Sequence, residues 1–194
     1  LIKKGKITKE DVVLVMPVDV CANKEYFECF AKMQKVVADK KADIALLGVV
    51  PTYPSAKYGY ITVEAEKLLD CEIYDVQGFV EKPSEERADT LIKDGAYWNA
   101  GVFAVSVEYV LNEAKKEISD ISYESVLMQY DKLENISFDY KIVEKTKKIA
   151  MVEYKGEWKD LGTWNTLTEE MDEICSGKTI VGEDCENTHI INEL

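Results

Sequence analysis

The stretch "ADIALLGVV", residues 42–50, is apolar from Ile44 onward and has the length of one β-strand. A strand without alternating polar positions is typical of the interior of a sheet that helices cover on both faces. A second Val-rich run, "DVVLVMPVD" at 11–19, lies upstream, and residues 25–41 between the two runs place apolar side chains at helical spacing. This order predicts a βαβ unit with two buried, parallel strands.

The rest of the chain also alternates strands and helices, but its strands look hairpin-like. Pro51 and Pro54 mark a loop before the extended segments, and a glycine interrupts the strand that contains "WNAGVF". The patterns predict helices over 84–95, 107–118, 122–133 and 163–174, and strands over 96–107 and 148–155. We therefore expect a three-layer α/β/α fold with a mixed sheet, parallel in its first half, in a domain over residues 1–174. Residues 175–194 are expected to begin a carboxy-terminal β extension.

Composition excludes several classes of function. The 194 residues carry a formal net charge of -13, whereas a nucleic-acid-binding domain usually shows a basic face, so nucleic acid is not an expected partner. Five cysteines without a CxxC pair and a single histidine give no convincing zinc site, and they indicate reduced thiols in a cytoplasmic protein. No apolar run approaches the ~20 residues that a membrane helix needs.

Polar side chains lie at or just beyond the expected strand ends, or in a strand beside them. They are Asp19, Glu81, Lys82, Asn99 and Asp160. Ligands in open α/β sheets bind at the carboxyl ends of strands, so we expect these five to share one cleft.

Each candidate also has a purely structural interpretation. Asp19 suits a turn or a helix N-cap, and Asp160 could cap the helix that begins near Thr163. Asn99, set among apolar residues, must hydrogen-bond either to protein or to ligand. Lys82 precedes a proline, which favours an extended backbone and a fixed side-chain direction.

Six short motifs, taken in this order, are more specific than any one of them. The chain resembles the sugar-nucleotidyltransferases, and within them the mannose-1-phosphate guanylyltransferase branch, over residues 11–172. The matching segments are "PVDV" (17–20), "YGYI" (58–61), "FVEKP" (79–83), "WNAGVF" (98–103), "SFDYKIVEK" (137–145) and "WKDLGTW" (158–164).

The resemblance implies transfer of a guanylyl group from GTP to mannose 1-phosphate, giving GDP-mannose and pyrophosphate. It implies Mg²⁺, with Asp19 and Asp160 as catalytic metal ligands, because magnesium takes one or two carboxylates plus phosphate oxygens. Trp158 and Trp164 would hold the loop that carries Asp160. The remaining assignments concern the substrates. Lys82 would bind the phosphate of the sugar phosphate, and Gly59 would let the chain pass close to the base or the sugar. The sugar hydroxyls would be bound by Glu81, Asn99, Asp139 and the backbone near Gly101.

Two departures from the family pattern qualify this expectation. Val20 stands where the family has a histidine, and the glycine-rich loop G-G-x-G-[ST]-R-x-x-P, which wraps the triphosphate, does not occur in this sequence. We therefore expect the amino-terminal part of the fold to be absent and residues 1–194 alone to be poorly active. A glucose-1-phosphate-type pyrophosphorylase and a non-catalytic sugar-phosphate-binding module stay open as alternatives. Homo-oligomerisation and continuation beyond residue 194 also stay open.

Overall fold

The computed structural model describes residues 2–69, 72–171, 173, 175–182, 185–186 and 188–192. It divides into two compact units, each formed by two stretches of chain. Unit 1 comprises Leu1–Pro17 and Lys24–Gly156, and unit 2 comprises Val18–Asn23 and Glu157–Leu194.

Unit 1 is built on a mixed six-stranded sheet with the order β1-β6-β3-β7-β5-β4, and β6 also pairs with β4. In this sheet β3 and β7 run parallel, and the other pairings are antiparallel. The strands are β1 (Val12–Val15), β3 (Ile44–Val49), β4 (Tyr60–Leu69), β5 (Ile73–Val80), β6 (Tyr97–Ser106) and β7 (Ile149–Tyr154).

Helices connect these strands, and four of them begin at a serine whose side chain accepts a backbone N–H, as helix starts require. The helices are η1 (Ile2–Lys4), α1 (Lys24–Ala38), α2 (Glu85–Lys93), α3 (Val107–Glu117), α4 (Tyr123–Gln129), η2 (Tyr130–Lys132), α5 (Phe138–Lys141) and η3 (Val143–Lys145). The predicted helices are therefore confirmed in unit 1, although "SFDYKIVEK" forms only short turns.

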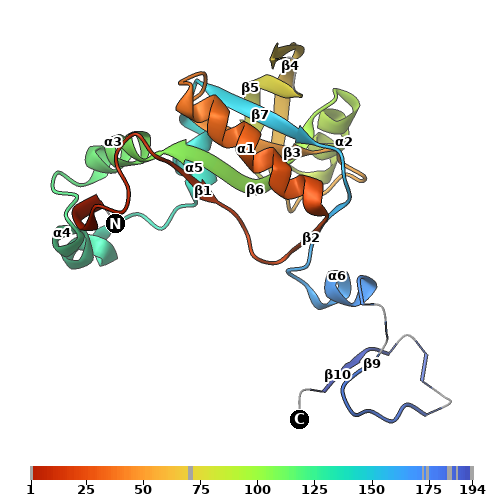
Figure 1. The fold of residues 1–194 in the computed structure, drawn as a ribbon. Helices are drawn as coiled ribbons and strands as arrows, with labels where there is room; N and C mark the ends of the chain where they lie inside the picture. The colour runs from red at the N-terminus through yellow and green to blue at the C-terminus, as the bar shows by residue number, and fades with distance from the viewer. Residues whose placement is uncertain are drawn as a thin grey trace. The chain divides into compact units, whose positions relative to one another are not determined.

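The sheet is covered on both faces, as the sequence predicted. Figure 1 shows α1 running across the strands, and it packs on β1, β3, β6 and β7. Ile44 and Leu46 of β3 belong to a buried cluster that includes Val143 of η3, while the alternate residues Ala45 and Leu47 are also fully buried. Because successive side chains of a strand point to opposite faces, β3 is the middle layer of three.

The prediction for β1 is wrong. It lies at an edge of the sheet, pairs antiparallel with β6, and leaves Val15 56% exposed. Strands β1 and β3 do share a direction, because β6 is antiparallel to both, but β6 lies between them. An apolar run in the sequence predicts a strand, but it does not show which distant strand will be its neighbour in the sheet.

Unit 2 contains an antiparallel pair of strands, β2 (Val20–Ala22) and β8 (Trp158–Asp160), followed by α6 (Trp164–Glu169). Two further short strands, β9 (Cys175–Ser176) and β10 (Ile190–Ile191), pair in parallel. The predicted domain boundary at residue 174 falls within this unit and stays a prediction.

Two further features bear on the sequence-based expectations. Four cysteines of the described residues are free thiols, namely Cys21, Cys29, Cys175 and Cys185, while Cys71 lies outside them. Among the helices that the structure describes, none has the length and apolar character needed to cross a bilayer.

Candidate functional site

The two aspartates predicted to hold a metal come together in unit 2. Strand β2 pairs with β8 so that Val20 lies opposite Asp160, and the backbone N–H of Leu161 donates to the carbonyl of Asp19 over 2.8 Å. Main-chain pairing therefore fixes the two acids as neighbours although they come from distant parts of the sequence.

Gly162 leaves open the space between the two carboxylates. Its N–H donates to Oδ1 of Asp160 over 2.8 Å. A Cβ on this glycine would lie 2.9 Å from Oδ1 of Asp160 and 3.3 Å from Oδ2 of Asp19, so both oxygens lie close to a single point. Any other residue would occupy that point, which is the position a shared ligand would need.

The alternative interpretation, in which Asp160 caps the following helix, does not agree with the structure. Thr163 caps α6 by accepting the N–H of Thr166, and the Thr166 side chain in turn accepts the N–H of Thr163. The carboxylate of Asp160 is therefore not required for the helix. The prediction that Trp164 holds this loop is also wrong, because its side chain is 73% exposed.

The oxygen donors of the acid pair fit the predicted Mg²⁺. Magnesium is bound in such sites by one or two carboxylates, with phosphate and water completing the shell. Within the described part of the chain, no group of three or more histidine, cysteine or acidic side chains could hold a metal, so a zinc-type or calcium-type cage is not found there.

In unit 1, Asn99 is the centre of a second cluster. Its amide is only 8% exposed; Nδ2 donates to Oδ1 of Asp139 over 3.1 Å, and Oδ1 accepts the N–H of Gly101 over 3.2 Å. The prediction that this amide must be hydrogen-bonded is confirmed. One N–H of the amide has no partner among the described residues.

A bulge in β6 positions this asparagine. Along β3, Leu46 pairs with Phe103 but Gly48 pairs with Asn99, so β6 holds extra residues between the two pairs. Gly101 lies in this stretch with a φ of 71°, a left-handed conformation that glycine adopts without strain. A bulge of this kind re-aims neighbouring side chains, as bulges beside active sites commonly do.

Gly59 and Glu81 lie against the same asparagine. The N–H of Asn99 donates to the carbonyl of Gly59 over 2.8 Å. A Cβ on Gly59 would lie 2.6 Å from Oε2 of Glu81 and 2.8 Å from Cζ of Phe79, so a larger residue would displace the glutamate. The structure therefore brings Gly59, Glu81, Asn99, Gly101 and Asp139 together, as the resemblance implied.

Lys82 follows directly, but its backbone differs from the prediction. Its φ is 46°, in the left-handed region, rather than extended as its position before Pro83 suggested. Non-glycine residues rarely adopt this conformation, and such strain gathers at ligand-binding sites. Its ammonium forms an ion pair with Oε1 of Glu81 over 3.2 Å, while 57% of the lysine side chain stays exposed.

The sequence analysis missed two residues that hold this turn. The N–H of Glu81 donates to Oε1 of Glu144, and the hydroxyl of Tyr140 donates to the carbonyl of Glu81, both over 3.4 Å. Both residues belong to "SFDYKIVEK", the motif that supplies Asp139. The acid and the aromatic residue are both visible in this motif, but residue spacing does not show that they contact the backbone of Glu81.

The electrostatics of the cluster favour binding of a polar or cationic group. Burial raises the pKa of the Glu81 carboxyl above its ordinary value, and the neighbouring Asp139 raises it further. Burial likewise raises the pKa of Asp139, although Lys82 and the Asn99 amide oppose that rise. Two half-buried acids at one place are costly unless a ligand hydrogen-bonds to them.

The eight predicted site residues thus form two groups, the acid pair in unit 2 and the Asn99 cluster with Lys82 in unit 1. That the two groups share one cleft stays a prediction.

The comparisons with known proteins identify the family. A family model described as nucleotidyl transferase matches residues 1–177. The chain belongs to the nucleotidyl transferase family. The resemblance found in the sequence is therefore confirmed at the level of the family, and the fold is of the α/β class with a mixed sheet.

Several relatives within the nucleotidyl transferase family carry more specific names. Mannose-1-phosphate guanylyltransferase of Escherichia coli is 30% identical over 218 residues, covering 100% of this chain and 47% of its own length. Alginate biosynthesis protein AlgA of Pseudomonas fluorescens is 30% identical over 201 residues, covering 94% of this chain and 41% of its own. The chain thus spans less than half the length of these two relatives.

A solved structure shows the same fold. A mannose-1-phosphate geranyltransferase from Thermus thermophilus superposes with a TM-score of 0.71 at 28% identity, covering 91% of this chain and 55% of that one. The likeness therefore extends over 91% of this chain.

Proposed function

We propose that this chain forms part of a magnesium-dependent enzyme that transfers a guanylyl group from GTP to mannose 1-phosphate. The observation that carries the proposal is the acid pair, Asp19 and Asp160, held on either side of the space that Gly162 leaves open. The names of the relatives support GTP and mannose 1-phosphate as the substrates.

The reaction needs position and charge more than covalent chemistry from the protein. An oxygen of the sugar phosphate attacks the α-phosphorus of the nucleotide, a new P–O bond forms, the α–β bridge breaks, and pyrophosphate leaves with the bridging oxygen. Such a transfer is accelerated mainly by alignment of the two substrates and by neutralisation of their phosphates.

The acid pair would hold the metal. Magnesium, when bound, neutralises phosphate charge and orients the phosphate oxygens. Asp160 is prepared for this role because its Oδ1 is fixed by the N–H of Gly162, and Asp19 because the carbonyl beside its side chain is tied to Leu161. The Asp160 carboxylate and the main chain at Asp19 are therefore already fixed before an ion binds.

The residues of unit 1 would bind the sugar phosphate. Lys82 is a compact charge suited to the phosphate, and its ion pair with Glu81 keeps it close to the buried cluster. The second N–H of the Asn99 amide would donate to a sugar hydroxyl, and the carboxylates of Glu81 and Asp139 would accept from others. Such acids hydrogen-bond polyhydroxylated ligands at little cost because the ligand replaces the water that they lost.

The proposal is tested with the whole enzyme of which this chain forms part, in the presence of Mg²⁺, by measuring pyrophosphate release for each pairing of GTP, dTTP, UTP or ATP with mannose 1-phosphate or glucose 1-phosphate. GTP with mannose 1-phosphate should be fastest. Preference for a glucose 1-phosphate pairing would assign the chain to another sugar-nucleotide pyrophosphorylase, and binding of sugar phosphate without any turnover would indicate a non-catalytic module.

Asp160→Asn connects this activity to the acid pair. It keeps the shape of the side chain and removes its charge, so turnover should be lost while the far-ultraviolet circular dichroism is unchanged. Asp131→Asn, at an exposed position of η2, is the matched control and should be fully active. Turnover by Asp160→Asn at the wild-type rate would refute the proposed metal role.

A further inference from the structure

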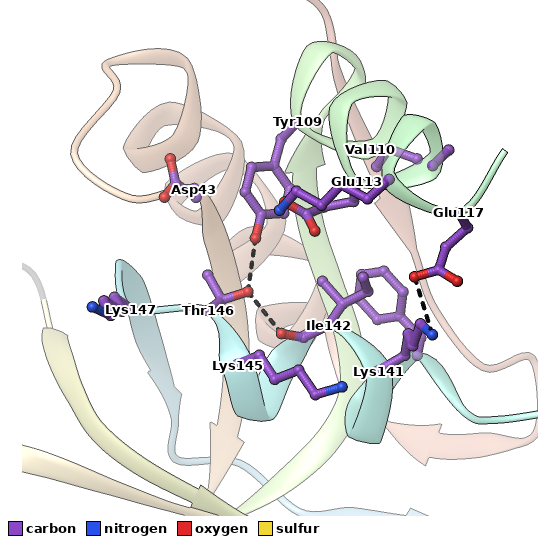
Figure 2. Close-up of a pocket in the computed structure, with 13 residues that line it drawn as sticks. Asp43, Tyr109, Val110, Glu113, Glu117, Lys141, Ile142, Lys145, Thr146 and Lys147 are labelled. Carbon is purple, nitrogen blue, oxygen red and sulfur yellow. Dashed lines mark hydrogen bonds and ion pairs between the residues drawn. The ribbon is translucent and has the colours of Figure 1, made fainter. Parts of the chain in front are cut away.

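A cavity of about 510 Å³ lies in unit 1, between α3 and the α5–η3 segment, and Asn99 is not among the residues that line it. Figure 2 shows the two walls facing each other across it, with Tyr109, Val110 and Glu113 on the α3 side and Lys141, Ile142 and Lys145 on the other. The volume is within the range that small-molecule sites occupy.

The cavity combines an apolar floor with a charged rim. Its apolar lining comes from Val110, Ala114, Phe138 and Ile142. Phe138 is 36% exposed as a residue although its ring packs edge-on against the ring of Phe103, a buried residue. An exposed aromatic ring held by a core ring is a rigid surface for a flat apolar ligand.

The rim offers an unengaged positive charge. Lys116 and Lys141 pair with glutamates of the rim, but Lys145 forms no ion pair with any residue that the structure describes. In Figure 2 its ammonium extends along the mouth of the cavity toward α5. In a chain of net charge -13, such a lysine beside an apolar hollow favours a ligand that carries an anion.

Two polar groups on the inner wall are already satisfied. The hydroxyls of Tyr109 and Thr146 are 2.8 Å apart, and the threonine hydroxyl also donates to the carbonyl of Ile142 over 2.8 Å. The wall is therefore rigid, and a ligand could enter without leaving a buried donor unpaired.

The short helix α5 belongs to both this cavity and the Asn99 cluster. Phe138 and Lys141 line the cavity, whereas Asp139, between them in sequence, accepts from Asn99. Tyr140 of the same turn donates to the carbonyl of Glu81. A ligand that displaces this four-residue helix must therefore also move the Asp139 carboxylate.

We propose that this cavity is a second ligand site, which takes an aromatic phosphate of nucleotide size, and that its occupancy is transmitted through α5 to the Asp139–Asn99 pair. The ring would lie on Phe138 and Val110, and the phosphate would lie at Lys145. The link to the Asn99 cluster is structural and does not depend on which substrate that cluster binds.

The test is a titration of the full chain with AMP, with adenosine and inorganic phosphate as separate arms. Calorimetry should detect AMP binding that is at least about tenfold tighter than binding of either part alone. In Lys145→Glu the affinity should fall by about tenfold or more, because a charge-assisted contact becomes repulsive. In Val110→Glu, which places a carboxylate over the apolar floor at a half-exposed helix position, binding should be lost.

Lys35→Glu is the matched control, since Lys35 is also an exposed lysine with no ion pair in the described chain and lies outside the cavity. AMP affinity should be unchanged there. AMP binding that persists in both cavity variants would place the ligand elsewhere and overturn the site, and phosphate binding as tightly as AMP would overturn the ligand class.

The proposed transmission from the cavity through α5 to Asn99 is tested by a separate measurement. Addition of AMP should shift the side-chain amide resonances of Asn99 in the nuclear magnetic resonance spectrum of the wild type, and not in that of Val110→Glu. Wild-type Asn99 resonances that stay fixed while AMP binds would overturn the transmission.

Discussion

The side-chain amide of Asn99 donates to the carboxylate of Asp139 over 3.1 Å, and this contact joins strand β6 to helix α5 inside unit 1. The bond stabilises the ionised form of an acid that burial otherwise favours in its protonated form. Asp139 is thus held ready to accept a hydrogen bond at some cost to the stability of the fold.

That cost should appear as a dependence on pH. The pKa of Asp139 is raised in the folded chain, so between the ordinary pKa of an aspartate, about 4, and the raised pKa the folded state binds more protons than the unfolded state. The free energy of unfolding should therefore fall as pH rises through this window. In Asp139→Asn the fall should be smaller, and the variant should be the more stable protein at neutral pH. Urea unfolding at several pH values measures both, with Asp131→Asn as the control; a steeper fall in Asp139→Asn would contradict the assignment.

Lys82→Ala should weaken binding of mannose 1-phosphate far more than binding of GTP. Loss of a charge-assisted hydrogen bond to phosphate typically costs ~1.5–3 kcal/mol, or roughly 10- to 150-fold in affinity. Calorimetry with each substrate on the whole enzyme of which this chain forms part measures both affinities, and Lys35→Ala should change neither. An equal loss for both substrates would mean that Lys82 serves only its ion pair with Glu81.

The effect of Lys82 substitutions on the free energy of unfolding should depend on the backbone conformation of this residue rather than on the charge of its side chain. Because Lys82 has a φ of 46°, Lys82→Gly should be more stable than Lys82→Ala by about 1 kcal/mol, since glycine enters the left-handed region without strain. At Lys57, an exposed turn residue without a positive φ, the order should reverse, so that the alanine variant is more stable than the glycine variant. Equal stability of Lys82→Gly and Lys82→Ala in urea unfolding would show that the turn carries no strain.

Gly162→Ala should impair the acid pair and leave the fold intact. The added methyl group would lie 2.9 Å from Oδ1 of Asp160 and 3.3 Å from Oδ2 of Asp19, whereas nothing lies within 4 Å of a Cβ on Gly182. A displacement of the pair on the order of 1 Å should reduce turnover by roughly 100-fold. Gly182→Ala, in the same unit, should keep full activity, and unchanged turnover in Gly162→Ala would argue against a ligand between the two acids.

Much of this arrangement could be predicted from local sequence. The glycine inside the strand of Asn99 and the buried strand within 42–50 each have a local physical cause, and the structure confirms both, with β3 buried over Ile44–Val49. The same holds for the prediction that Asn99 must be hydrogen-bonded, because burial of an amide demands it.

What failed depended on distant partners. Strand β6 lies beside β1 and β3 because of pairings over long separations, which no periodicity encodes. Lys82 departs from the backbone that Pro83 favours, since hydrogen bonds from Tyr140 and to Glu144 hold the preceding residue. A tertiary contact of this kind overrides a local preference, and spacing alone cannot reveal it.

The pairing of β2 with β8 has a consequence for the order of folding. These strands flank the whole Lys24–Gly156 stretch of unit 1, so their register forms only when the ends of that long segment approach each other. Closing so long a loop is entropically unfavourable until the intervening chain has become compact. The acid pair should therefore be among the last features to assemble, and a nascent chain that has emerged only as far as residue 156 can hold the Asn99 cluster in place while still lacking the β2–β8 pairing that brings Asp19 and Asp160 together.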